Sequence, residues 1–98
     1  MKEMVKGEIS GNRFLKMGHL GSAEKQYAKE GKSKAEIAAR LGNFCERKGW
    51  CHSAAMYYGK EGSPRSKTKI LRLAEILEKE GRPDIARQIV ILGNKKED

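Results

Sequence analysis

Apolar residues recur along the chain at the spacing of amphipathic helices. Ile70, Leu73 and Leu77 stand three and four positions apart, which is the rhythm of one helix face. The aliphatic run 89–92 could form a strand in isolation, but Ile85 and Ala86 extend it with helical spacing. No alternating strand pattern or hairpin turn competes elsewhere, so the chain is predicted to be all-α. Six helices are expected, near residues 3–17, 21–30, 34–48, 51–61, 64–80 and 83–92.

Start and stop signals agree with these boundaries. Ser33 and Glu36 form the pattern of a capping box that opens a helix. Ser63 followed by Pro64 reads as an N-cap and a first helical position, and Pro83 repeats that role. Gly31 and Gly62 are expected to end two further helices.

Three glycines anchor an internal repeat. Gly18, Gly49 and Gly81 are separated by 31 and 32 residues. Around each glycine the same residue types recur at fixed offsets: Gly11, Gly42 and Ala74; Phe14, Cys45 and Leu77; Ala23, Ala54 and Ala86; Tyr27, Tyr58 and Val90. The pattern predicts a helical hairpin repeated three times. The glycine ends the first helix in the left-handed region, and the small residues lie where the two helices cross.

These positions resemble the tetratricopeptide repeat. The second copy matches best, with Leu41-Gly42, Gly49, Ala54, Tyr58 and a closing Pro64. The resemblance implies a right-handed α-solenoid of three antiparallel hairpins in a single domain. The repeats would span about residues 4–31, 34–62 and 65–93, with a polar tail at 94–98.

In that family the first helix of each repeat lines an inner groove that binds a peptide. The resemblance places Asn12 and Asn43 at equivalent positions, with Lys16 and Arg47 one turn further along, and Arg72 joining from the third repeat. Asn amides can hold a peptide backbone, while Lys and Arg bind carboxylates. The expected function is therefore a protein-interaction module that binds a protein or an acidic peptide.

Charge leaves an alternative open. The net charge is +8 over 98 residues, and a basic balance favours nucleic acids as well as acidic peptides. The basic positions Lys60, Arg65, Lys67 and Lys69 are the candidates for phosphate contacts. Interspersed Lys and Glu are also typical of solvated helix faces and of thermophile proteins.

The sequence offers little for catalysis or for metal binding. His19, Cys45, Cys51 and His52 do not have the spacing of a zinc site. Asp84 is better explained by a helix first turn than by catalysis, and no phosphate loop or dinucleotide motif occurs. We therefore expect no enzyme activity, no cofactor and no metal. No segment reaches the roughly 20 apolar residues of a membrane span, and a cytoplasmic location with reduced cysteines is expected.

The last helix carries more apolar residues than one face can bury. Packing on its own hairpin should use Ala86, Val90 and part of Ile89. The set Ile85, Ile89, Ile91 and Leu92 is expected to bind a second copy of the chain or a partner helix.

Overall fold

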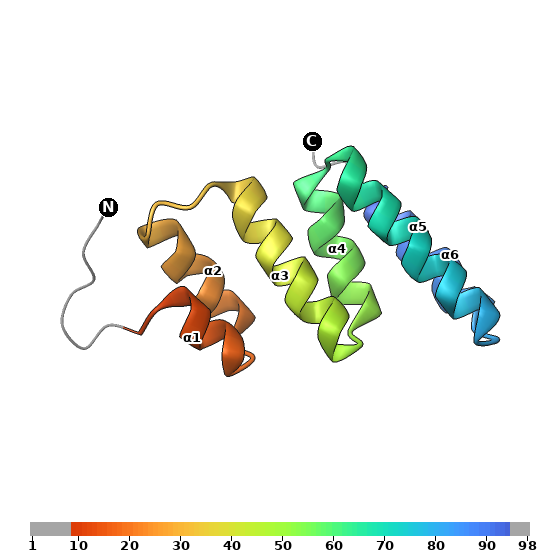
Figure 1. Ribbon diagram of the computed structural model, residues 1–98, viewed down its shortest axis with the longest axis horizontal. Helices are drawn as coiled ribbons and strands as arrows, with labels where there is room; N and C mark the ends of the chain where they lie inside the picture. Colours follow the sequence, from red (N-terminus) through yellow and green to blue (C-terminus); the bar gives the residue numbers. More distant parts are fainter. Residues whose placement is uncertain (1–8, 95–98) are drawn as a thin grey trace.

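The computed structural model describes residues 9–94, and this range forms six α-helices and no strand (Figure 1). The helices are α1 (Gly11–Lys16), α2 (Leu20–Lys29), α3 (Lys34–Lys48), α4 (Cys51–Glu61), α5 (Pro64–Lys79) and α6 (Pro83–Gly93). The all-α prediction is thus confirmed for these residues. Five of the six predicted helices agree closely in their bounds.

The first helix is the exception. It was expected to start near residue 3, and residues 3–8 of that prediction lie outside the described residues. Ile9 and Ser10 are not helical, and α1 begins at Gly11. The reason is local: the Ser10 Oγ accepts a hydrogen bond from the Arg13 backbone N–H at 3.2 Å, which is the geometry of an N-cap.

Serine caps open two later helices in the same way. The Oγ atoms of Ser33 and Ser63 accept from the backbone N–H three residues on, at 3.1 and 3.2 Å. Pro64 follows Ser63 at the first helical position, as predicted. The Glu36 carboxylate, which the predicted capping box would direct back to Ser33, instead pairs with Lys32 and Arg40.

Left-handed glycines close the first helix of each pair. Gly49 has φ +79°, and Gly18 and Gly81 have nearly the same value, at +81° and +80°. A residue with a Cβ adopts this conformation at a cost, so Gly is favoured there. The anchor glycines of the repeat therefore act as the sequence predicts.

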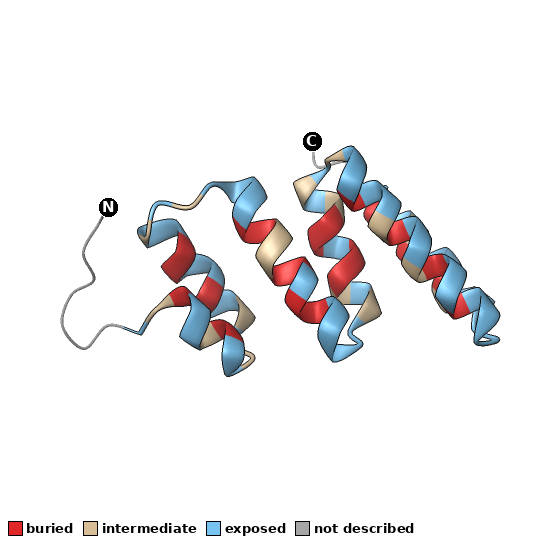
Figure 2. Cartoon of the chain, in the orientation of Figure 1, coloured by how far each residue is buried: buried red, intermediate tan, exposed pale blue. Residues whose placement is uncertain are grey.

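Helices adjacent in sequence pack together as three consecutive pairs, α1 with α2, α3 with α4 and α5 with α6. Figure 2 shows the buried residues along the facing sides of these helices. In the first two pairs a tyrosine ring lies on a glycine: a Cβ on Gly11 would come within 2.4 Å of the Tyr27 ring, and one on Gly42 within 2.7 Å of the Tyr58 ring. In the third pair Ala74 and Val90 occupy the equivalent positions.

The pairs succeed one another along the longest axis of the molecule, and α6 lies behind α5 in Figure 1. We call the contact between the first and second pairs the first junction, and that between the second and third pairs the second junction. At the first junction the main contact is that of α2 with α3. At the second junction α4 packs on both α5 and α6. Within residues 9–94, none of the helices has both the length and the apolar character that crossing a membrane requires.

Candidate functional site: a basic groove

The residues expected to form a binding groove line two neighbouring clefts. The first cleft lies between α1 and α3 and has a volume of about 530 Å³. It is lined by Asn12, Leu15, Lys16, Phe44, Arg47 and Lys48. The second lies between α3 and α5, has a volume of about 260 Å³ and is lined by Asn43, Glu46, Arg47, Lys69 and Arg72. Arg47 belongs to both, so the two clefts adjoin, and we call them together the basic groove.

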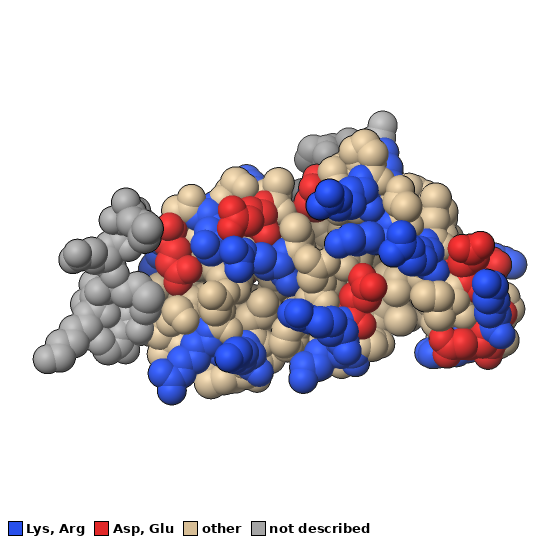
Figure 3. Space-filling view, in the orientation of Figure 1, with Lys and Arg blue, Asp and Glu red and all other residues tan. Residues whose placement is uncertain are grey.

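Cations dominate the polar lining of the basic groove. Lys16, Lys48 and Lys69 join the two arginines, while Glu46 is the one carboxylate in the two linings. Viewed from the side on which α5 lies in front of α6, Lys and Arg side chains are numerous over the middle of the molecule (Figure 3). Such a surface attracts anionic ligands and repels cationic ones.

The two asparagines are engaged inside the protein. Asn12 Oδ1 accepts a hydrogen bond from the Tyr27 hydroxyl at 2.6 Å, and Asn43 Oδ1 accepts one from the Tyr58 hydroxyl at 2.8 Å. Each asparagine Oδ1 also accepts a hydrogen bond from a cation of the following helix pair. Arg40 donates to Asn12 at 3.5 Å, and Lys69 Nζ donates to Asn43 at 2.9 Å. Each Asn therefore joins its own helix pair to the next one. Their side-chain oxygens already have partners, and the amide NH₂ groups are the atoms left for a ligand.

The tyrosines of these networks resist ionisation. Burial raises the pKa of Tyr58. The Glu46 carboxylate, which shares the single hydroxyl proton with Asn43 and lies at 2.5 Å, raises this pKa further. Burial also raises the pKa of Tyr27, although the neighbouring Arg40 guanidinium acts in the opposite direction. Both phenols remain protonated donors at neutral pH, which keeps the asparagine oxygens in place.

An apolar strip runs beside the cations of the first cleft. Leu15 and Phe44 are 8% and 7% exposed, so they form its floor rather than its rim. Trp50 is 43% exposed and packs edge-on against Phe44, with ring centroids 5.8 Å apart. Trp50 therefore packs on Phe44 while keeping nearly half of its surface exposed.

The basic residues considered for nucleic acid do not share one surface. Lys69 lines the basic groove, whereas Lys60 lines a different cleft beside α2. Lys67 lies about 160° around α5 from Lys69, because successive helical residues are rotated by about 100°. Arg65 is exposed near the start of the same helix. Arg65 precedes Lys69 by four positions and shares its face of α5. Lys60 and Lys67 lie elsewhere, so the four residues do not form one stripe for a phosphate backbone.

The expected apolar surface on α6 is smaller than predicted. Ile89 was placed in it, and this is wrong: the side chain is 0% exposed, because α6 packs on α4 as well as on α5. Ile85 and Leu92 are half-buried and pack against the core. Ile91 is 62% exposed, and it is the member of the set that is fully available to a partner.

Both cysteines are free thiols, and burial raises the pKa of Cys45. Among residues 9–94 no group of three or more His, Cys, Asp or Glu side chains is arranged to hold a metal ion. Asp84 stands in the first turn of α6, where the sequence placed it.

Sequence reasoning missed several residues of the groove, namely Leu15, Phe44, Glu46, Lys48 and the groove role of Lys69. Helical spacing could have found them, because each lies three or four positions from another residue that lines the groove and therefore shares its helix face.

Comparison of the chain with protein-family models, with curated proteins and with solved structures gave no match.

Proposed function

We propose that this chain is a protein-interaction module whose basic groove binds an acidic peptide. The observation that carries the proposal is the pair of adjoining clefts that share Arg47. They combine five cations, one carboxylate and a buried apolar strip along successive helix pairs. We further propose that the three helix pairs form a right-handed solenoid of the tetratricopeptide kind, on the evidence of left-handed glycines and glycine–tyrosine packing at repeated positions.

The ligand follows from this chemistry. Arg47 and Arg72 can bind a carboxylate through two parallel hydrogen bonds. The amide NH₂ groups of Asn12 and Asn43 can donate to peptide carbonyls. The apolar strip beside Phe44 accepts a hydrophobic side chain. The best ligand is therefore an extended peptide with acidic residues and one apolar side chain, and a free C-terminal carboxylate would suit the arginines.

The test is a titration with a short acidic peptide that ends in a free carboxylate. Trp50 is the single tryptophan of the chain, and its contact with Phe44 makes its fluorescence a reporter of the first cleft. We expect saturable binding, and we expect Arg47→Ala to weaken it about tenfold or more, because hydrogen bonds to charged groups contribute about 1.5–3 kcal/mol. Arg87→Ala is the matched control: this arginine is exposed on α6 and lines neither cleft.

Three further ligands test which chemical groups the basic groove binds. The amidated peptide measures the part played by the terminal carboxylate, and a peptide with Lys in place of its acidic residues should not bind. Equal binding by the wild type and Arg47→Ala would reject the groove. Binding of an oligonucleotide with a steep salt dependence, abolished in Arg65→Ala/Lys67→Ala, would replace the proposal by nucleic-acid binding.

A further inference from the structure

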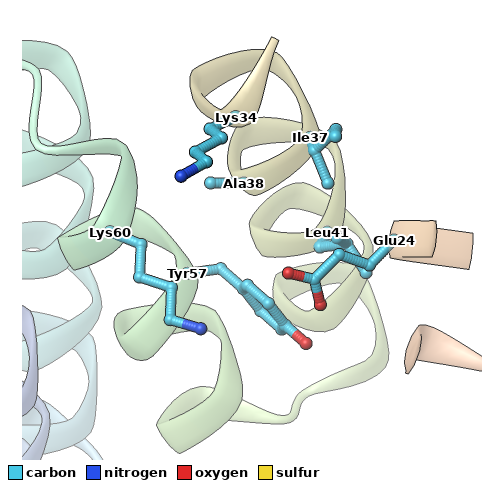
Figure 4. Close-up of a pocket in the computed structure, with 7 residues that line it drawn as sticks. All are labelled: Glu24, Lys34, Ile37, Ala38, Leu41, Tyr57 and Lys60. Carbon is cyan, nitrogen blue, oxygen red and sulfur yellow. The ribbon is translucent and has the colours of Figure 1, made fainter. Parts of the chain in front are cut away.

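A cleft that the basic groove does not include opens across the first junction. It lies between α2 and α4, with α3 as its floor, and has a volume of about 250 Å³ (Figure 4). It is lined by Glu24, Lys34, Ile37, Ala38, Leu41, Tyr57 and Lys60. This volume is just below the range of about 300–1,000 Å³ that is usual for pockets of drug-sized ligands. The cleft therefore suits a smaller molecule.

The floor and one wall of the cleft are apolar and held in place by the core. Ile37 and Ala38 are each 6% exposed, Leu41 is fully buried, and Tyr57 is 7% exposed. The Tyr57 ring stands against this floor from α4 (Figure 4). Such a surface takes up a hydrophobic side chain without having to rearrange.

Charges of opposite sign stand on opposite sides of the cleft. The ammonium groups of Lys34 and Lys60 lie on one side, and the Glu24 carboxylate lies on the other, next to the Tyr57 hydroxyl (Figure 4). The proximity of that carboxylate also contributes to a raised Tyr57 pKa, after the larger effect of burial. Within residues 9–94, Glu24, Lys34 and Lys60 take part in none of the ion pairs. Lys60 Nζ lies 5.6 Å from the centroid of the Tyr57 ring. In this part of the chain none of the three side chains is neutralised by an opposite charge, so a ligand can supply one.

We propose that this cleft binds a free, zwitterionic amino acid with a large apolar side chain. The ligand's carboxylate pairs with Lys34 and Lys60, its ammonium pairs with Glu24, and its side chain packs on Leu41 and the Tyr57 ring. A simple fatty or aromatic acid would leave Glu24 without a partner, and an amine would leave both lysines without one. An internal peptide residue carries neither charge, so the arrangement favours the free amino acid.

The cleft and the basic groove can be tested separately. Their linings have no residue in common. On α3, Leu41 and Arg47 are about 120° apart by the 100° rotation of successive residues, and Lys34 and Asn43 are about 180° apart. Loss of one binding activity therefore says nothing about the other.

The experiment is a titration with L-phenylalanine, followed by amide chemical shifts and by thermal stability. We expect saturable shifts at Ala38, Leu41 and Tyr57, and a melting temperature that rises with ligand concentration, because a ligand that binds only the folded state stabilises it. In parallel, 3-phenylpropionate and 2-phenylethylamine, which each lack one charge, should bind about fivefold more weakly or worse. The amide of N-acetylphenylalanine should bind more weakly still.

Substitutions test the role proposed for each charged side chain of the cleft. Lys60→Gln and Glu24→Gln should each weaken L-phenylalanine binding about fivefold, the effect of one exposed ion pair of about 1 kcal/mol. Lys25→Gln is the matched control, because Lys25 is exposed beside Glu24 but does not line the cleft. Circular dichroism checks that each variant keeps its helices.

The outcomes separate clearly. The absence of any shift in the millimolar range would overturn the proposal. So would 3-phenylpropionate binding as well as L-phenylalanine, or full affinity in Lys60→Gln and Glu24→Gln. An unchanged L-phenylalanine affinity in Arg47→Ala is expected and supports a site separate from the basic groove.

Discussion

The two junctions between helix pairs are built from equivalent positions but pack differently. At the second junction the backbones of α4 and α6 come so close that a Cβ on Gly59 would lie 2.9 Å from the Gly93 carbonyl oxygen. At the first junction the position equivalent to Gly59 is Ala28, which is exposed, and a cleft of about 250 Å³ separates α2 from α4. The closed junction therefore has a glycine at this position of the repeat, and the junction with the cleft has an alanine.

The polar contacts of the two junctions are more alike. Arg40 reaches Asn12 across the first, and Lys69 reaches Asn43 across the second. Each of these cations also lies over the ring of the tyrosine that is bonded to that asparagine, at 5.5 and 5.1 Å from its centroid. The same cation–tyrosine–asparagine arrangement thus links neighbouring pairs at both junctions, while the apolar packing differs between them.

The largest loss of stability is expected from placing a side chain in the second junction, where α4 and α6 pack closely. Gly59→Leu should lower the free energy of unfolding by about 3 kcal/mol, since a side chain there meets the Gly93 backbone, which cannot move aside without separating α4 from α6. Ala28→Leu is the matched substitution at the first junction and should change stability by less than about 0.5 kcal/mol. Urea unfolding followed by circular dichroism measures both. Equal losses in the two variants would mean that the junctions do not differ as described.

A smaller effect is expected from the tyrosine hydroxyls. Tyr58→Phe should cost about 1 kcal/mol at neutral pH, the usual value for a hydrogen bond. The pKa of Tyr58 is raised by burial and by Glu46. Above about pH 10 the unfolded chain therefore loses the phenol proton while the folded chain keeps it, and stability falls as pH rises.

The pH dependence sharpens the comparison between the junctions. Tyr58→Phe should remove more of the alkaline loss of stability than Tyr27→Phe, because Arg40 partly offsets the raised pKa of Tyr27. Urea midpoints measured between neutral pH and about pH 11 test this, across the ordinary tyrosine pKa of about 10. The raised pKa values of Tyr57 and Cys45 should leave a residual slope in both variants. A steeper slope in Tyr58→Phe than in the wild type would contradict the assignment.

Removing the cations should have a smaller effect still. Lys69→Met loses the contacts with Asn43 and the Tyr58 ring, and Arg40→Met loses those with Asn12 and the Tyr27 ring as well as the Glu36 ion pair. Each of these contacts is partly exposed and worth less than about 1 kcal/mol. We expect the loss to shrink when salt is added, because screening already weakens such interactions. Thermal unfolding at low and high salt gives the comparison, and a loss that does not depend on salt would show that packing rather than charge is affected.

The smallest change in stability is expected at the exposed end of the third pair. Ile91 stands at the position equivalent to Gly59 and Ala28, and it is 62% exposed. Ile91→Glu should alter the free energy of unfolding by less than about 0.5 kcal/mol, yet it should abolish self-association if α6 joins two chains. Sedimentation of the wild type and the variant over a range of concentrations decides this. A wild type that stays monomeric throughout would remove the homodimer from consideration.

Much of the fold could be predicted because it depends on local rules. Gly49 ends a helix and Ser63 opens one through contacts within a few residues, so the sequence carries these signals directly. Ile9 and Ser10 were predicted to be helical, but α1 begins at Gly11 because the Ser10 side chain caps its first turn.

The site could be predicted less well, because it depends on how the pairs are placed. Asn12 and Asn43 were expected to hold a ligand, but their oxygens bind Tyr27 and Tyr58. The repeated spacing of 15 residues between Asn and Tyr is a signal that could have suggested this bond. The burial of Ile89 and the cleft beside Tyr57 have no such signal, because both arise from the different closure of the two junctions.

One feature of the packing also bears on how the chain folds. Every substantial helix contact in residues 9–94 joins helices that are neighbours in sequence or separated by one helix. Folding therefore brings together few segments that are far apart in the chain. Chains of this kind cross low topological barriers and fold on microsecond to millisecond timescales. Because the first pair is held chiefly through α2 and α3, it can open without disturbing the Gly59–Gly93 contact. The amides of α1 and α2 should accordingly form the first unit to exchange with solvent, while α4 and α6 remain protected until the whole molecule unfolds.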